Sequence, residues 1–136
     1  MRRLVLIVGV VSLLCALGWG VRAWTTVRLN ARASNLNVDV ENLFVGLQRY
    51  KEYVGQYPNG SNAKIVKALM GENPKSVIIL VGRKTDLNSQ GELIDPWGTP
   101  LRIYFAGEGI LIRSAGPNKR FDDSTAVGAD DYYRSN

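Results

Sequence analysis

The sequence predicts an α+β protein in which one long N-terminal helix carries a small globular domain. Three observations support this class: an apolar run continued by a helical stripe, two short apolar segments joined by a glycine-containing turn, and a terminal stretch without periodicity. The chain has 136 residues, so that only roughly 80 lie beyond the long helix, enough for one modest core. We divide it into residues 1–23 (membrane anchor or signal segment), 24–57 (amphipathic extension of the helix) and 58–136 (globular domain).

The first segment is predicted to span a membrane. Between Arg3 and Arg22, the run Leu4–Val21 holds 18 residues with no charge and no proline. An α-helix of that length covers about 27 Å, close to the hydrocarbon thickness of a bilayer. Basic residues before the run favour a cytoplasmic N-terminus. We therefore expect a single-pass protein whose C-terminal domain lies outside the cytoplasm.

A cleaved secretory signal peptide is the alternative for the same segment. Leu4–Leu17 would form its apolar region and Val21-Arg22-Ala23 its cleavage site. An arginine fits such a site poorly, and the helical pattern continues through it. The uncleaved anchor is therefore favoured.

Composition limits the possible functions. Arg2, Arg3 and Arg22 flank the apolar run, and removing these three from 17 basic residues leaves 14 against 12 acidic ones, so we expect no nucleic-acid partner. The chain has no histidine, and its single cysteine, Cys15, lies in the apolar run, where it can form no internal disulfide. No serine lies in a nucleophile-elbow context, and we do not expect an enzyme.

The long helix continues well past the apolar run. Nine apolar residues, spaced alternately four and three apart, place one stripe along a helix whose other faces are polar. The stripe consists of Leu29, Ala33, Leu36, Val40, Leu43, Leu47, Tyr50, Val54 and Tyr57. The spacing fits packing on the chain's own domain and a seam to other copies equally well. We expect residues 29–36 to face partners and residues 40–57 to face the domain.

A second, shorter helix is predicted after a turn. Gly55 and Pro58 are expected to end the long helix near residue 54. The polar residues 59–62 form a turn that offers capping side chains to a helix over Ala63–Met70. The apolar run Val77–Val81 is either a buried strand or an extended segment.

Two strands are predicted near the C-terminus. Leu101–Phe105 and Ile110–Ser114 are expected to pair as a β-hairpin through the turn at residues 106–109. Beyond Ser114 no periodicity remains, and the composition of glycine, proline and aspartate is that of a loop held by something other than a core.

The stretch between these elements contains a partial calcium-binding pattern. Asp86, Asn88 and Gln90 match the start of an EF-hand loop, but Trp97 stands at the twelfth position, which requires a bidentate glutamate. We therefore predict a polar turn without a metal. Asp95 is expected to cap a turn, with Trp97 inserted into the core and its indole N–H needing a partner.

Five features in this order resemble the major pseudopilins of type II secretion systems. They are the long apolar N-terminal helix, Gly55-Gln56-Tyr57-Pro58, Asp95-Pro96-Trp97-Gly98-Thr99-Pro100, Ser114-Ala115-Gly116-Pro117-Asn118 and Asp130-Asp131. The resemblance covers most of the chain from about residue 29. It implies a type IV pilin-like fold, in which the N-terminal helix packs on a small antiparallel sheet with a C-terminal loop. It also implies an inner-membrane subunit with a periplasmic domain, which joins other copies and other secretion-machine proteins in a short filament.

The resemblance also implies a calcium site in the C-terminal loop. The matching positions are Asn118, Asp130 and Asp131, with a carbonyl near Ser114, and with Asp122 or Asp123 as alternates. Calcium takes six to eight oxygen ligands in irregular geometry, which suits a loop without a core. The family usually has aspartate where Asn118 stands, so one negative charge is lost here. A solvated acidic tail is the alternative.

The N-terminus departs from the pattern of pilin-like precursors. Such precursors carry a phenylalanine after a glycine cleavage point and a glutamate shortly into the mature helix, whereas here no phenylalanine precedes Phe44 and no carboxylate precedes Asp39. This departure favours a second candidate, a membrane-anchored extracytoplasmic binding module that does not polymerise. A third candidate is a minor pilin for DNA uptake, which would require an exposed basic stripe.

Overall fold

The computed structural model describes residues 31–81, 86–122 and 129–136. The predicted membrane run Leu4–Val21 and the alternate ligand Asp123 lie outside the described residues. The chain divides into two compact units, Met1–Asn35 and Leu36–Asn136, and the description below concerns the second unit. Within the described ranges, no helix combines the length and the apolar character needed to cross a bilayer.

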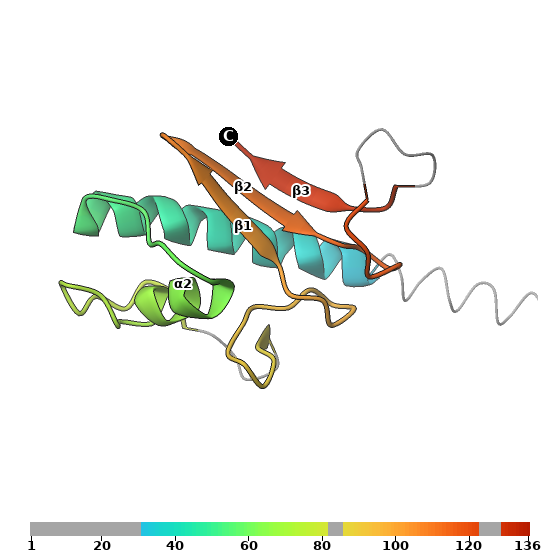
Figure 1. Ribbon diagram of the computed structural model, residues 1–136, viewed down its shortest axis with the longest axis horizontal. Coiled ribbons are helices and arrows are strands. Elements are labelled where there is room, and N and C mark those ends of the chain that lie inside the picture. Colours follow the sequence, from blue (N-terminus) through green and yellow to red (C-terminus); the bar gives the residue numbers. More distant parts are fainter. Residues whose placement is uncertain (1–30, 82–85, 123–128) are drawn as a thin grey trace, which may run out of the picture. The chain divides into compact units, whose positions relative to one another are not determined.

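The second unit has the predicted α+β class. The first helix is described over residues 31–54. A short helix, α2 (Asn62–Leu69), follows it. Three strands, β1 (Arg102–Ala106), β2 (Gly109–Ser114) and β3 (Tyr132–Ser135), form one antiparallel sheet in the order β1-β2-β3 (Figure 1). The first helix packs on this sheet through a shared hydrophobic core, which confirms the predicted packing of a helix on a small antiparallel sheet.

From Leu36 to Tyr50, the predicted apolar stripe is the buried side of the first helix, and Leu29 lies outside the described residues. The expectation that Leu36 faces partners is wrong, because this side chain is 1% exposed and belongs to the core of the chain's own domain. The buried side chains of the helix are Leu36, Val40, Leu43, Phe44, Leu47 and Tyr50, which form one cluster with Ile110 and Ile112 of β2. The helix ends at residue 54, where Gly55 takes a φ of +96° and its N–H bonds the carbonyl of Lys51 at 2.7 Å. Glycine adopts this left-handed conformation without steric cost, so the predicted stop is confirmed.

The predicted hairpin is present, with slightly different strand ends. Strands β1 and β2 pair from Arg102 opposite Arg113 to Ala106 opposite Gly109, across a two-residue turn. Gly107 is the first turn residue and has a φ of +58°, in keeping with the preference of type II′ turns for glycine at this position. This register turns the inward side chains of β2 toward the helix.

The prediction of a loop for the entire tail after Ser114 is wrong. Tyr132–Ser135 form β3, which pairs antiparallel with β2 so that Ser114 lies opposite Tyr132. The ring of Tyr132 stacks on Trp97 at a centroid distance of 5.7 Å. The strand is therefore held by pairing and by side chains from distant parts of the chain, although it is short and contributes little apolar surface of its own.

The short helix α2 lies one residue earlier than predicted. Ser61 stands at its N-cap but makes no side-chain capping bond. Asn62 binds backbone instead: its Nδ2 donates to the carbonyls of Leu93 (3.1 Å) and Leu101 (2.7 Å), and its Oδ1 accepts the Leu93 N–H at 2.8 Å. This one amide fixes the chain segments before β1 onto α2.

Residues 77–81 form an extended segment outside the sheet. The N–H groups of Ile79 and Leu80 donate to the carbonyl of Leu69 at 2.8 and 3.0 Å, and both side chains pack against the core. Of the two predicted alternatives for this run, the extended segment is the one observed. Ile78 and Val81 point away from the core and are 65% and 84% exposed.

An ion pair joins β3 to the first helix and makes a pH-dependent contribution. Arg134 Nε bonds Glu41 Oε2 at 2.6 Å, and this hydrogen bond lowers the pKa of Glu41. A lowered pKa in the folded state means that the pair stabilises the fold above the ordinary glutamate pKa. That contribution is lost as the pH falls through the folded-state pKa.

Replacing Arg134 by glutamine is expected to return the pKa of Glu41 to its ordinary value. The change in unfolding free energy should be small, because the pair is exposed to solvent. A carboxyl-detected NMR titration of Glu41 in both proteins measures the shift. An unchanged Glu41 pKa in R134Q would show that the pair does not form in solution.

Candidate metal centre in the C-terminal loop

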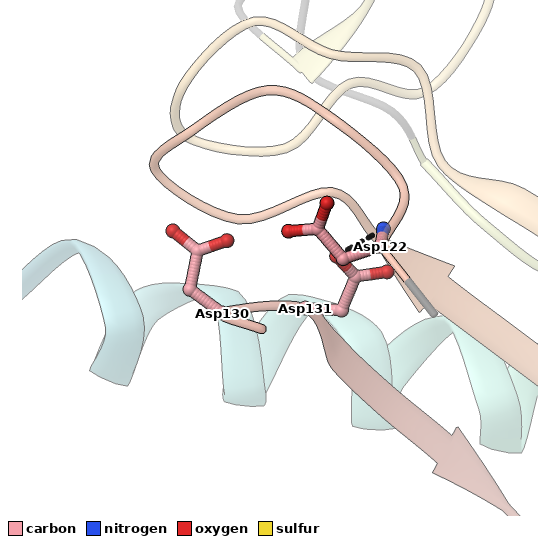
Figure 2. Close-up of side chains that lie close together, drawn as sticks. All are labelled: Asp122, Asp130 and Asp131. Carbon is pink, nitrogen blue, oxygen red and sulfur yellow. Dashed lines mark hydrogen bonds between the residues drawn. The ribbon is translucent and has the colours of Figure 1, made fainter. Parts of the chain in front are cut away.

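Three aspartates gather where the C-terminal loop meets the start of β3. One oxygen from each of Asp122, Asp130 and Asp131 lies within 4.8 Å of the other two (Figure 2). Two of these residues immediately precede β3 in the chain, and the third comes from the loop that follows β2. Carboxylate oxygens at this spacing are able to bind a cation, although acidic groups also gather without one.

A protein cation already contacts this cluster. Arg113 of β2 donates from Nε to Asp131 Oδ2 at 2.5 Å, and its Nη2 contacts the backbone carbonyl of Asp122. The other oxygen of Asp131 accepts the Asp122 N–H at 3.1 Å, drawn as the dashed line in Figure 2. The Asp131 side chain is only 5% exposed. Both of its oxygens are therefore occupied by donors from the chain itself.

Asn118 serves this cluster mainly as a donor. Its Nδ2 donates to Asp122 Oδ2 at 2.5 Å and its backbone N–H to Asp130 Oδ2 at 3.1 Å. Its Oδ1 accepts the N–H of Arg120 at 2.7 Å. If the Asn118 amide were flipped, its oxygen would face the Asp122 carboxylate and its NH₂ group would face the Arg120 N–H. Both contacts would be repulsive, so these partners fix the orientation of the Asn118 amide. The predicted ligand oxygen of Asn118 thus points away from Asp122.

Asp130 contributes an oxygen that a further cation would satisfy. Its Oδ1 is buried and has no hydrogen-bond partner within the described part of the chain. The loop approaches the same residue closely at Gly116, where φ is +67° and an added Cβ would lie 2.2 Å from the Asp130 carbonyl oxygen. Only glycine fits at this contact.

A hydrogen-bond network connects this loop to the turn before β1. Asp95 is buried, and its Oδ1 accepts the N–H groups of Trp97 (3.0 Å) and Thr99 (2.8 Å), which confirms its predicted role as a turn cap. Its Oδ2 accepts the hydroxyl of Ser114 at 2.8 Å, and that hydroxyl accepts the Gly116 N–H at 3.1 Å. A calcium-binding carbonyl near Ser114 stays a prediction, and the contacts observed here are those of the Ser114 hydroxyl.

The EF-hand-like stretch is a polar turn, as predicted. Asn88 Oδ1 accepts the N–H groups of Gln90 (2.9 Å) and Glu92 (3.0 Å), and the backbone closes the turn between Asn88 and Glu92. Trp97 is buried in the core, as predicted. Its indole N–H, however, has no hydrogen-bond partner among the described residues.

Arg113 is the residue of this site that the sequence did not identify. The strand that contains Arg113 was predicted from its apolar residues, which say nothing about Arg113 itself. Its acidic partner, Asp131, lies 18 residues later in the sequence. The only available signal was its place on the outward side of β2, next to a tail rich in aspartate.

No family model, curated protein or solved structure matches this chain. The guanidinium of Arg113 holds Asp131 Oδ2 and the Asp122 carbonyl, so these two oxygens are available to a divalent cation only if Arg113 moves. Calcium binding stays a prediction.

Proposed function

We propose that this protein is a structural pilin-like subunit of a type II secretion pseudopilus, assembling with other copies of itself and with other pseudopilins. The observation that carries the proposal is the packing of the first helix on the sheet through one apolar stripe. That arrangement is the one that the sequence resemblance implies for the periplasmic part of such a subunit. The preceding apolar run is long enough for a helical anchor.

The contacts of the motif residues also support a structural role. Asp95 caps a turn, Gly116 permits a close backbone approach, and Ser114 joins the two segments. Each of these residues makes contacts that shape the domain. A filament subunit requires this kind of fixed shape and needs no catalytic group.

The second candidate is an anchored module that binds another protein without polymerising. Two observations favour it: the lack of any carboxylate before Asp39, and the exposure of Ile78 and Val81 on one extended segment. Two exposed aliphatic side chains three positions apart on one short segment suit a protein contact.

The test is the intact mass of the full-length protein recovered from membranes of a host that has a prepilin peptidase. Loss of a few N-terminal residues together with one added methyl group is expected for a pseudopilin. A full-length mass would favour the non-polymerising module, because a retained leader obstructs helix packing in a filament. A product that starts at Trp24 would contradict both membrane-anchored candidates.

The matched control is the same host without its peptidase. The mass there should correspond to the complete chain, which separates specific processing from general proteolysis. Assembly is then measured by isolating sheared filaments from cells that carry the remaining secretion machinery. A processed protein that never enters filaments would contradict the polymerising function.

A further inference from the structure

We propose that the guanidinium of Arg113 is the cation that holds the C-terminal loop, in the place where the resemblance puts calcium. The proposal concerns the stability of the loop, and it holds whether or not the chain is a filament subunit. It rests on the contacts of Arg113, on its charged neighbours and on the orientation of Asn118.

Arg113 connects the same kinds of group that a bound metal would connect. It reaches a carboxylate just before β3 through Asp131, and a loop carbonyl through Asp122. Calcium holds loops by collecting carboxylate and carbonyl oxygens, and a guanidinium collects them by charge-assisted hydrogen bonds. One side chain of β2 thus joins the loop to the segment that leads into β3.

The neighbours of Arg113 explain why its charge is directed at the aspartates. Arg102 lies directly opposite it in the β1–β2 register, an unfavourable pairing of like charges. The two guanidinium carbons lie 3.8 Å (Arg102) and 5.6 Å (Arg113) from the centre of the Phe121 ring. The shorter distance makes Phe121 the main partner of Arg102, which leaves Arg113 to the acidic cluster.

Asn118 suits a loop that contains a fixed monovalent cation. An aspartate at this position would add a fourth carboxylate to the cluster. The single positive charge of one guanidinium would neutralise four carboxylates less well than three. The amide instead donates to Asp122 Oδ2, so these two side chains satisfy each other without a metal between them. The absence of a negative charge at position 118 is therefore consistent with a loop held by the single positive charge of Arg113.

The test compares the full-length protein with Arg113→Met in detergent micelles, in millimolar calcium or in chelator. Thermal unfolding is followed by near-ultraviolet circular dichroism. The wild type should melt at the same temperature in both solutions. R113M should melt roughly 10 °C lower in chelator, because a charge-assisted bond to a nearly buried carboxylate is lost. Calcium should raise the melting temperature of R113M by several degrees, since three carboxylates then lack a cation.

Two further variants control for charge and for packing. Arg102→Met removes a guanidinium from the same register position on β1 and should produce no response to calcium. Arg113→Lys keeps the charge without the fork of donors, so its melting temperature should lie between those of wild type and R113M. If R113M does not fold in chelator, the yield of folded protein on refolding with calcium replaces the melting shift.

Three results would overturn the proposal. The first is a wild-type protein that calcium stabilises by several degrees, which would mean that the loop is held by the metal and not by Arg113 alone. The second is an R113M protein as stable as wild type in chelator. The third is a destabilised R113M that does not respond to calcium, because Arg113 would then be an ordinary structural side chain.

Discussion

Replacing Asp95 by alanine is expected to lower the free energy of unfolding by about 3–4 kcal/mol, because three donors, two of them buried, lose their acceptor at once. The carboxylate is 2% exposed and accepts from Trp97, Thr99 and Ser114 at 2.8–3.0 Å. Its loss should loosen the turn before β1 together with the loop after β2, since Ser114 belongs to both networks. Equilibrium unfolding in guanidinium chloride measures the difference.

Asp95→Asn is the matched control for this substitution. The amide keeps an oxygen for the two backbone N–H groups, and its NH₂ faces a hydroxyl that is able to accept. D95N should therefore lose less than half of what D95A loses. Equal losses in the two variants would show that the negative charge, and not the geometry of the acceptor, is what the turn requires.

Replacing Leu47 by alanine is expected to cost about 2–5 kcal/mol of unfolding free energy. Leu47 is fully buried at the middle of the stripe, where the first helix meets the sheet. Truncation removes buried apolar surface and leaves a cavity that the surrounding strands fill only in part. The same denaturant titration, with the full-length chain in detergent, measures the loss.

Val38→Ala on the same helix provides the comparison. Val38 is 59% exposed, so its truncation should change stability by no more than about 0.5 kcal/mol. Alanine also has a better helix propensity than valine, which offsets any lost contact. A large loss in V38A would mean that this face of the helix is covered by another molecule under the conditions of the measurement.

Local patterns made the helices and the hairpin predictable. The stripe from Leu36 to Tyr50 repeats with the period of a helix, so its buried side and its end at Gly55 followed from spacing and from one glycine. The hairpin likewise depends on neighbouring residues: two apolar runs and a turn. In each case, the information lies within one element and its flanking residues.

Features that depend on distant contacts were not predictable. The strand β3 has a short polar sequence, and it forms because β2 offers an edge and because Trp97 and Glu41 meet its side chains. The role of Arg113 depends on an aspartate 18 residues later. The hydrogen bonds of the Asn62 side chain depend on backbone carbonyls 31 and 39 residues later. No spacing rule links such positions, because the fold itself brings them together.

The wide sequence separation of helix and sheet has a consequence for how the protein folds. Glu41 and Arg134 are 93 positions apart, and the strands that cover the stripe are synthesised long after it. Pairings of this range make folding slow, since the chain must close a large loop before any of them forms. Sheet closure should therefore limit the folding rate, and until it occurs the apolar stripe is exposed to aggregation or to capture by a chaperone.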